Sequence, residues 1–206
     1  MSVTGRLIFV RHGQTPANVE RVWHGSTDTP LTELGHTQAR QLSSYFHNVM
    51  KPDLVFASPL QRARNTAEAI ASRHGLQVNL DPRFQELCLG DWEGLHFDDI
   101  NSGHDKEGRI YSDPDFAPPG GESQRVVRDR MLAAIEEALS VHRGRNIVVV
   151  SHGVAIGITL SHFLHSDTTH WLQYNHQNTA FSELCLREKK LIYFNRTDHY
   201  EWQDSA

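Results

Sequence analysis

The chain has 206 residues, of which 38% are hydrophobic and 22% are charged, and its formal net charge is −5 with histidine neutral. A chain of this size and composition predicts one globular domain with a sizeable core. The acidic balance gives no general attraction to nucleic acid or to an anionic membrane, and no apolar run approaches the roughly 18 residues of a transmembrane helix.

Two further features bound the setting of the protein. The first residues lack the long apolar segment of a signal peptide, and the two cysteines, Cys88 and Cys185, show no C-x-x-C spacing. We therefore expect a cytoplasmic protein without a disulfide framework or a cysteine zinc site.

Short apolar runs alternate with amphipathic segments over the first 80 residues. Ser58 is expected to cap a helix that has Pro59 at its first position and ends near Gly75. The predicted elements are a strand at 6–10, a helix at 32–47, a strand at 53–57, a helix at 59–73 and a strand at 76–80.

Residues 81–121 are punctuated by glycine and proline, and they predict a loop-rich insert with one helix near Asp98 that forms part of a substrate cap. Ser123 then caps a helix that runs to about residue 142. The remaining expectations are a strand ending at Val150, a helix at 153–164, a hairpin of strands at 181–186 and 191–194, and a poorly ordered tail from His199. This alternation predicts an α/β fold with a mostly parallel sheet.

Two strands of the predicted sheet end in almost the same sequence. The first runs into Arg11-His12-Gly13 and the later one into Ser151-His152-Gly153. Ligands of open α/β sheets bind outside the carboxyl ends of the strands, and a guanidinium group binds phosphate or carboxylate. The pair predicts a site for anionic chemistry, in which a histidine could be a nucleophile, a general base, a metal ligand or a packed bystander.

Two other segments carry candidate site residues. Arg62 lies in the first turn of the predicted helix after Pro59, where a cation is unfavourable unless an anion offsets it. Glu86 lies among apolar residues in the 84–94 segment, an environment that favours the neutral acid, although a simply solvated carboxylate fits equally well.

The ordered set of motifs resembles the histidine phosphatase superfamily, in the branch that contains cofactor-dependent phosphoglycerate mutases and related small phosphatases. The Leu-Gly-Asp-Trp-Glu-Gly run is most similar to the broad-specificity phosphatases of that branch. The matching segments are residues 11–15 with Asn18, 28–32 with Gly35 and 38–39, 58–63 with 66–67, Glu86 with 89–94, 120–123 and 151–153.

The resemblance implies a three-layer sandwich and a phosphohistidine mechanism without metal or cofactor. His12 would attack phosphorus, and Glu86 would protonate the leaving oxygen and then help to activate water. A charged His152 would hold the phosphoryl group together with Arg11 and Arg62. The phosphate-binding set implied by the resemblance is Arg11, Gln14, Asn18, Arg62, His152 and Gly153.

Departures from the family pattern favour a phosphatase that acts on a small phosphorylated metabolite. Gln14 stands where many members carry glutamate, but both residues occur in the family's pattern, so this departure changes little. Mutases of the branch have a longer insert with an adjacent arginine pair, whereas this insert offers Lys106 and Arg109. The alternatives are a phosphoglycerate mutase and a non-catalytic phospho-ligand module on the same fold. A homodimer is a possible assembly, and specificity is expected from residues 14–29 and 87–121.

Two groups of residues outside these motifs are explained most simply without a role in the site. His162 and His165 have the His-x-x-His spacing of some metal sites, but solvent-facing histidines explain it more simply. Four aromatic residues fit either the core or the mouth of a substrate site, and the core is the default. They are Trp92, Phe97, Trp171 and Tyr174.

Overall fold

The structure, a computed structural model, describes residues 5–201. Within this range six strands form one sheet in the order β3-β2-β4-β1-β5-β6. Strands β3, β2, β4 and β1 are parallel, and β5 and β6 add an antiparallel hairpin. The strands are β1 (Leu7–Arg11), β2 (Leu54–Ala57), β3 (Val78–Leu80), β4 (Ile147–Ser151), β5 (Phe181–Cys185) and β6 (Lys190–Arg196).

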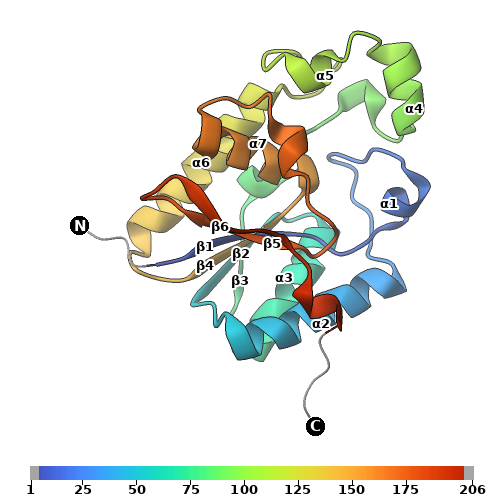
Figure 1. The fold of residues 1–206 in the computed structure, drawn as a ribbon. Coiled ribbons are helices and arrows are strands. Elements are labelled where there is room, and N and C mark those ends of the chain that lie inside the picture. The colour runs from blue at the N-terminus through green and yellow to red at the C-terminus, as the bar shows by residue number, and fades with distance from the viewer. Residues whose placement is uncertain (1–4, 202–206) are drawn as a thin grey trace.

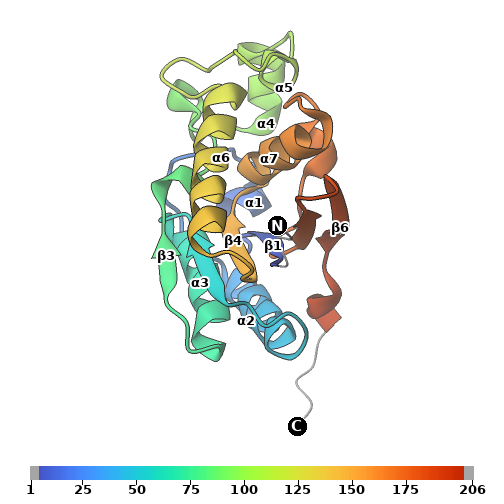
Figure 2. The ribbon, with the colours of Figure 1, turned by 90° about the vertical axis from the view of Figure 1, so that its left-hand side faces the viewer.

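Helices cover both faces of this sheet, so the expected three-layer α/β arrangement is confirmed. Figure 1 shows α6 and α7 on one side of the sheet and α2 and α3 on the other, and Figure 2 shows the same layers from the side. No helix of the described range is long and apolar enough to cross a membrane. The helices are α1 (Pro16–Glu20), α2 (Glu33–Val49), α3 (Gln61–Arg73), α4 (Phe97–Asp99), α5 (Arg109–Ser112), α6 (Gln124–Val141) and α7 (Gly153–His165).

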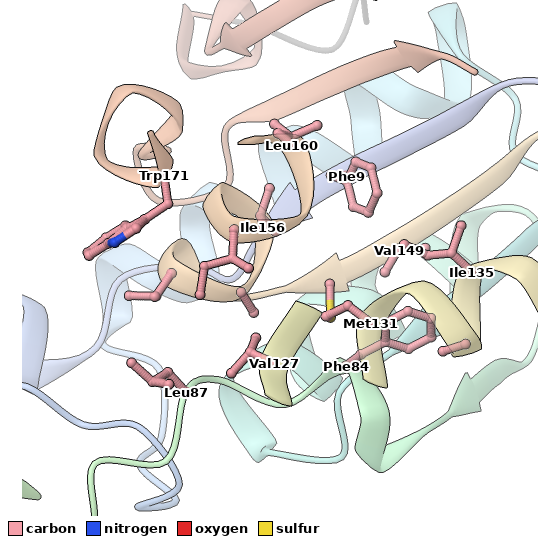
Figure 3. Close-up of a cluster of buried hydrophobic side chains, with 14 of the residues drawn as sticks. Phe9, Phe84, Leu87, Val127, Met131, Ile135, Val149, Ile156, Leu160 and Trp171 are labelled. Carbon is pink, nitrogen blue, oxygen red and sulfur yellow. The ribbon is translucent and has the colours of Figure 1, made fainter. Parts of the chain in front are cut away.

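The central strands β1 and β4 are buried on both faces, which explains their continuous apolar sequences. Their parallel register pairs Ile8 with Val148 and Phe9 with Val149. Phe9 and Val149 belong to the core under α6 and α7, which Figure 3 shows, whereas Ile8 and Val148 belong to the core under α2 and α3. The sheet register therefore also sets where the first residue after each strand lies.

The cap lies beyond the carboxyl ends of the parallel strands (Figure 1). It contains α1 after β1, and α4 and α5 within the insert. The helix expected near Asp98 is present as α4. The short helices α1 and α5 were not predicted, because four or five residues carry too little periodicity.

Two sequence-based expectations are wrong in detail. Ser58 does not cap the helix after it, because α3 starts later and the carboxylate of Asp28 accepts a hydrogen bond from the Gln61 N–H at 2.8 Å. Residues 198–201 form a 3₁₀ helix with His199 fully buried, so the expected disordered tail does not begin at His199. The rest of that tail, residues 202–206, lies outside the described range.

Candidate active site

The two histidines directly after β1 and β4 lie side by side. Because Arg11 pairs with Ser151 in the parallel register, the next residue of each strand is delivered to the same edge of the sheet. The ring centroids of His12 and His152 are 5.1 Å apart with a tilt of 60°. The anionic site predicted at these two strand ends thus has a defined geometric basis.

His12 is buried and is held in one tautomer. Its Nδ1 lies 2.7 Å from the carbonyl oxygen of Gly13, which can only accept a hydrogen bond. Nδ1 therefore carries the hydrogen, and the lone pair is on Nε2. Burial, together with the charges of Arg62 and Arg11, lowers the pKa of His12 well below its ordinary value. The neutral ring has the protonation state that a nitrogen nucleophile requires.

Arg62 is only 2% exposed and contacts His152. Its Nε–H donates to Nδ1 of His152 at 3.2 Å. Its two terminal nitrogens donate to the carbonyl oxygens of Thr27 and Gly25, both at 2.7 Å. By contrast, Arg64 is exposed and paired with Glu68, as expected for a surface arginine. The site therefore contains a buried guanidinium group in contact with one of the two histidines.

The hydrogen bond from Arg62 also fixes the state of His152. Because Nδ1 of His152 accepts, the hydrogen of the neutral ring is on Nε2, a buried nitrogen with no partner among residues 5–201. Burial and the neighbouring charge of Arg62 lower the pKa of His152 well below its ordinary value. In the free protein His152 therefore offers a neutral N–H donor, whereas its charge when it holds a phosphoryl group stays a prediction.

Glu93 holds the loop whose carbonyl groups bind Arg62. Its carboxylate accepts from the backbone N–H groups of Gly25, Ser26 and Thr27 at 2.8–3.2 Å and from the Thr27 hydroxyl at 2.7 Å. Burial alone would raise the pKa of Glu93, but these hydrogen bonds outweigh it and lower the pKa. The sequence placed Glu93 in a motif without giving it a role, and the structure makes it a positioning residue for Arg62.

Glu86 is buried at the N-terminus of α7. Its carboxylate accepts from the backbone N–H groups of Leu87, Val154 and Ala155 at 2.8–3.0 Å. The residue before α7, His152, makes no side-chain cap, so Glu86 supplies the cap from a distant segment. This contact brings a carboxyl group to the strand edge where the two histidines lie.

Arg130 on α6 fixes the segment that carries Glu86. It donates to the carbonyl oxygens of Arg83, Gln85 and Glu86 at 2.7–2.9 Å and pairs with Glu122 at 2.9 Å. No local pattern in the sequence marked Arg130, because its partners lie far away along the chain.

The other predicted phosphate ligands differ in their placement. Arg11 lines the cavity and donates to the carbonyl oxygen of His176. Asn18 also lines it, and its side-chain oxygen accepts from the Thr15 N–H and from the amide of Asn178, which leaves its own amide hydrogens available. Gln14 does not line the cavity, because its side-chain oxygen accepts from the hydroxyl of Thr32 at 2.9 Å.

These residues surround a cavity of about 440 Å³ at the carboxyl edge of the sheet. Arg11, His12, Arg62, Glu86 and Gly153 lie in its wall, and His152 is fully buried in contact with Arg62. Two of the four aromatic residues singled out from the sequence, Phe97 and Trp171, also line it. Trp92 packs in the core, as expected by default.

Metal-ligating residues do not cluster in the described range: no group of three His, Cys, Asp or Glu side chains has the geometry to hold an ion. His165 of the His-x-x-His pair instead has its Nε2 2.6 Å from the hydroxyl of Tyr174.

Comparison with known proteins places this geometry in context. A curated relative from Cronobacter sakazakii named "Probable phosphoglycerate mutase GpmB" is 37% identical over 161 residues, which is 77% of this chain and 74% of the relative. A solved mycobacterial glucosyl-3-phosphoglycerate phosphatase, in complex with VO3, has a TM-score of 0.84 at 31% identity and covers 93% of this chain and 99% of its own.

A second solved structure, the α-ribazole phosphatase of Shigella flexneri, has a TM-score of 0.79 at 27% identity and covers 93% of this chain and 96% of its own. The family model of the histidine phosphatase superfamily (branch 1) matches residues 7–196. That range contains all the motifs that carry the resemblance. The chain belongs to branch 1 of the histidine phosphatase superfamily.

Proposed function

We propose that the protein is a phosphatase that hydrolyses a small phosphomonoester through a phosphohistidine on His12. The observation that carries this proposal is the tautomer of His12. Its Nδ1 is committed to the Gly13 carbonyl, which leaves the Nε2 lone pair of a cavity-lining residue for attack on phosphorus. Solved relatives of similar fold are phosphatases, which supports the same chemistry.

In the first step, Nε2 of His12 forms a bond to phosphorus while the ester P–O bond breaks. The leaving oxygen takes a proton from Glu86. Arg11, Arg62 and the Nε2–H of His152 offset the charge that develops on the phosphoryl oxygens. Asn18 contributes its free amide hydrogens.

In the second step, a water molecule attacks phosphorus, the N–P bond breaks and inorganic phosphate leaves. Glu86, now a carboxylate, accepts the proton from that water and passes it to the departing phosphate, so the site returns to its starting state. The proton that Glu86 gives to the leaving oxygen enters with a monoanionic phosphomonoester, and the proton that it takes from water leaves with the inorganic phosphate.

The number of cations in the cavity wall favours hydrolysis over a mutase reaction, because a mutase needs further cations to bind the substrate carboxylate. Arg109 pairs with Asp113 and packs over Phe116, and neither it nor Lys106 lines the cavity. Beyond Arg11 and Arg62, the cavity wall within residues 5–201 contains one more arginine, Arg21, which faces Asp98 at 3.5 Å. This arrangement offers little to grip the carboxylate of a phosphoglycerate.

The relatives named phosphoglycerate mutase keep a second candidate open, and one experiment separates the two. Purified protein is incubated with p-nitrophenyl phosphate, with a panel of phosphomonoesters and with 3-phosphoglycerate, and both phosphate release and 2-phosphoglycerate are measured. We expect phosphate release that is lost in His12→Ala together with acid-labile labelling of the protein. Interconversion of the phosphoglycerates without net hydrolysis would establish the mutase, and a protein that only binds phosphate esters would be a phospho-ligand module.

A further inference from the structure

Beyond the phosphoryl site, the cavity has a wall of stacked aromatic rings. We call Phe97, Trp23, Tyr111 and Trp171 the aromatic wall, and all of them line the cavity. Trp23 stacks on Phe97 with centroids 5.0 Å apart and on Tyr111 at 6.4 Å, and Tyr111 stacks on Trp171 at 5.8 Å. The interplanar angles are 18–21°, so the rings form one row.

The row joins three parts of the chain that share the cavity with His12. Trp23 comes after α1, Phe97 and Tyr111 belong to the insert, and Trp171 comes after α7. The backbone of Trp171 packs closely against Gly157 of α7. The closeness is such that a Cβ atom added to this glycine would lie only 2.7 Å from the Trp171 carbonyl oxygen. The wall is therefore fixed relative to the helix whose start binds Glu86.

One polar atom in this wall lacks a partner. The indole Nε1–H of Trp171 is buried and has no hydrogen-bond partner among residues 5–201, although the side chain is only 4% exposed. Figure 3 shows this side chain at the left edge of the buried cluster, beside α7. Buried indole N–H groups usually find an acceptor, so a bound molecule that brings one would complete the wall.

The charges in the cavity limit what that molecule can be. Arg11 and Arg62 lie with His12 at the phosphoryl end, and Arg21 shares its charge with Asp98 at the outer surface. The wall itself adds no cation, and apolar rings next to it disfavour an unpaired carboxylate or second phosphate.

We propose that the aromatic wall selects phosphomonoesters whose leaving group contains an uncharged, flat ring with a hydrogen-bond acceptor for Trp171. This inference rests on the proposed phosphatase function and names its substrate class. The ring packs along the row while the phosphoryl group lies against Arg11 and Arg62. Binding energy from the ring then positions the phosphorus at His12.

The test compares esters whose leaving groups are all primary alcohols, so that the bond-breaking chemistry is matched. The substrates are n-butyl phosphate, 2-phenylethyl phosphate, 2-(pyridin-3-yl)ethyl phosphate and, as the polar comparison without a ring, glycerol 3-phosphate. We expect 2-phenylethyl phosphate to exceed n-butyl phosphate in kcat/KM by roughly 3- to 10-fold, mainly through KM. The pyridyl ester should gain about fivefold more from its ring nitrogen.

Two variants assign these gains to particular groups. Trp171→Phe keeps a ring but removes the N–H, so it should erase the pyridyl advantage and retain the phenyl advantage. Tyr111→Leu should reduce both. Phe194→Leu, at an exposed aromatic residue of β6 outside the cavity, is the matched control and should change neither ratio. Because each readout is a ratio of substrates, partial unfolding of a variant does not imitate the result.

The outcomes separate the two proposals. If no ester, including p-nitrophenyl phosphate, releases phosphate, the phosphatase function itself fails. If phosphate is released but n-butyl phosphate or glycerol 3-phosphate is hydrolysed as efficiently as the ring esters, the phosphatase stands and the substrate class is wrong. An unchanged pyridyl advantage in Trp171→Phe would show that the Trp171 N–H does not bind the ring nitrogen.

Discussion

The Nε–H of Arg62 donates to Nδ1 of His152 at 3.2 Å, and this single contact sets which nitrogen of His152 carries the hydrogen. Burial, together with the charge of this same cation, lowers the pKa of His152 and keeps its imidazole neutral. His152 can therefore present an N–H to a phosphoryl oxygen without adding a charge to a site that already contains Arg11 and Arg62.

Replacing Arg62 should damage catalysis far more than binding of the leaving group. Arg62→Ala removes a buried cation and frees the tautomer of His152, so kcat should fall by roughly 10²- to 10³-fold. Steady-state phosphate release from p-nitrophenyl phosphate measures the loss. Arg64→Ala, at an exposed residue on the same helix, is the control and should stay within about twofold of the unchanged protein.

Replacing Glu86 should matter most for poor leaving groups. A nitrophenolate leaves readily without a proton, whereas an alkoxide does not, so Glu86→Gln should slow alkyl esters more than nitrophenyl phosphate, by roughly 10- to 100-fold. The ratio of the two rates is insensitive to the fraction of folded protein. This matters because glutamine would face the Val154 and Ala155 N–H groups with one acceptor fewer. Equal losses for both esters would argue against the acid role of Glu86.

Glu93 should act on catalysis without touching the substrate. Glu93→Gln weakens the hold on Gly25 and Thr27, whose carbonyl groups bind Arg62. We expect kcat to fall while KM for the ring esters changes little, together with a loss of about 1–3 kcal/mol in the free energy of unfolding. Asp91→Asn, at an exposed neighbour, provides the matched comparison. A stability loss with unchanged kcat would reduce Glu93 to a structural role.

Stability should fall as the pH is lowered from about 6.5 to about 4. Burial lowers the pKa of both His176 and His199 to about 4 from an ordinary value of 6.5. Between pH 6.5 and 4 the unfolded chain binds protons that the folded chain does not. As the pH falls through this window, each of these histidines therefore lowers the free energy of unfolding by up to about 3 kcal/mol. Above pH 6.5 this loss is absent. His12 and His152 act in the same direction.

Urea unfolding at several pH values measures this loss, and His199→Gln provides the comparison. Nε2 of His199 lies 2.9 Å from the Thr179 hydroxyl, and the amide of glutamine can donate to the same atom without titrating. The variant should therefore lose stability less steeply between pH 6.5 and 4. A variant with the same slope as the original protein would show that His199 does not contribute.

The sequence predicted those parts of the molecule that local pattern and burial determine. The strands before His12 and His152 were predicted because central parallel strands are apolar on both faces, and their shared edge came from the strand direction. The buried Arg62 was indicated by its unfavourable place at a helix N-terminus.

The features that the sequence missed depend on contacts between distant segments. Arg130 binds carbonyl groups more than 40 positions away, and Asn178 reaches Asn18 across an even greater separation. Similarly, the packing of His199 on Thr179 orders residues that look like a polar tail. The neutral state of His152 required the direction of one hydrogen bond, which residue types and spacing do not encode.

The pairing of Arg11 with Ser151 has a consequence for how the site comes into being. The two strands lie far apart along the chain, so the histidines meet only after the closure of a very long loop, which is a slow event in folding. Recovery of activity during refolding should therefore lag behind the recovery of helical signal from α2, α3 and α6. The enzyme would gain its activity in the last stage of assembly, which makes turnover a sensitive reporter of complete folding.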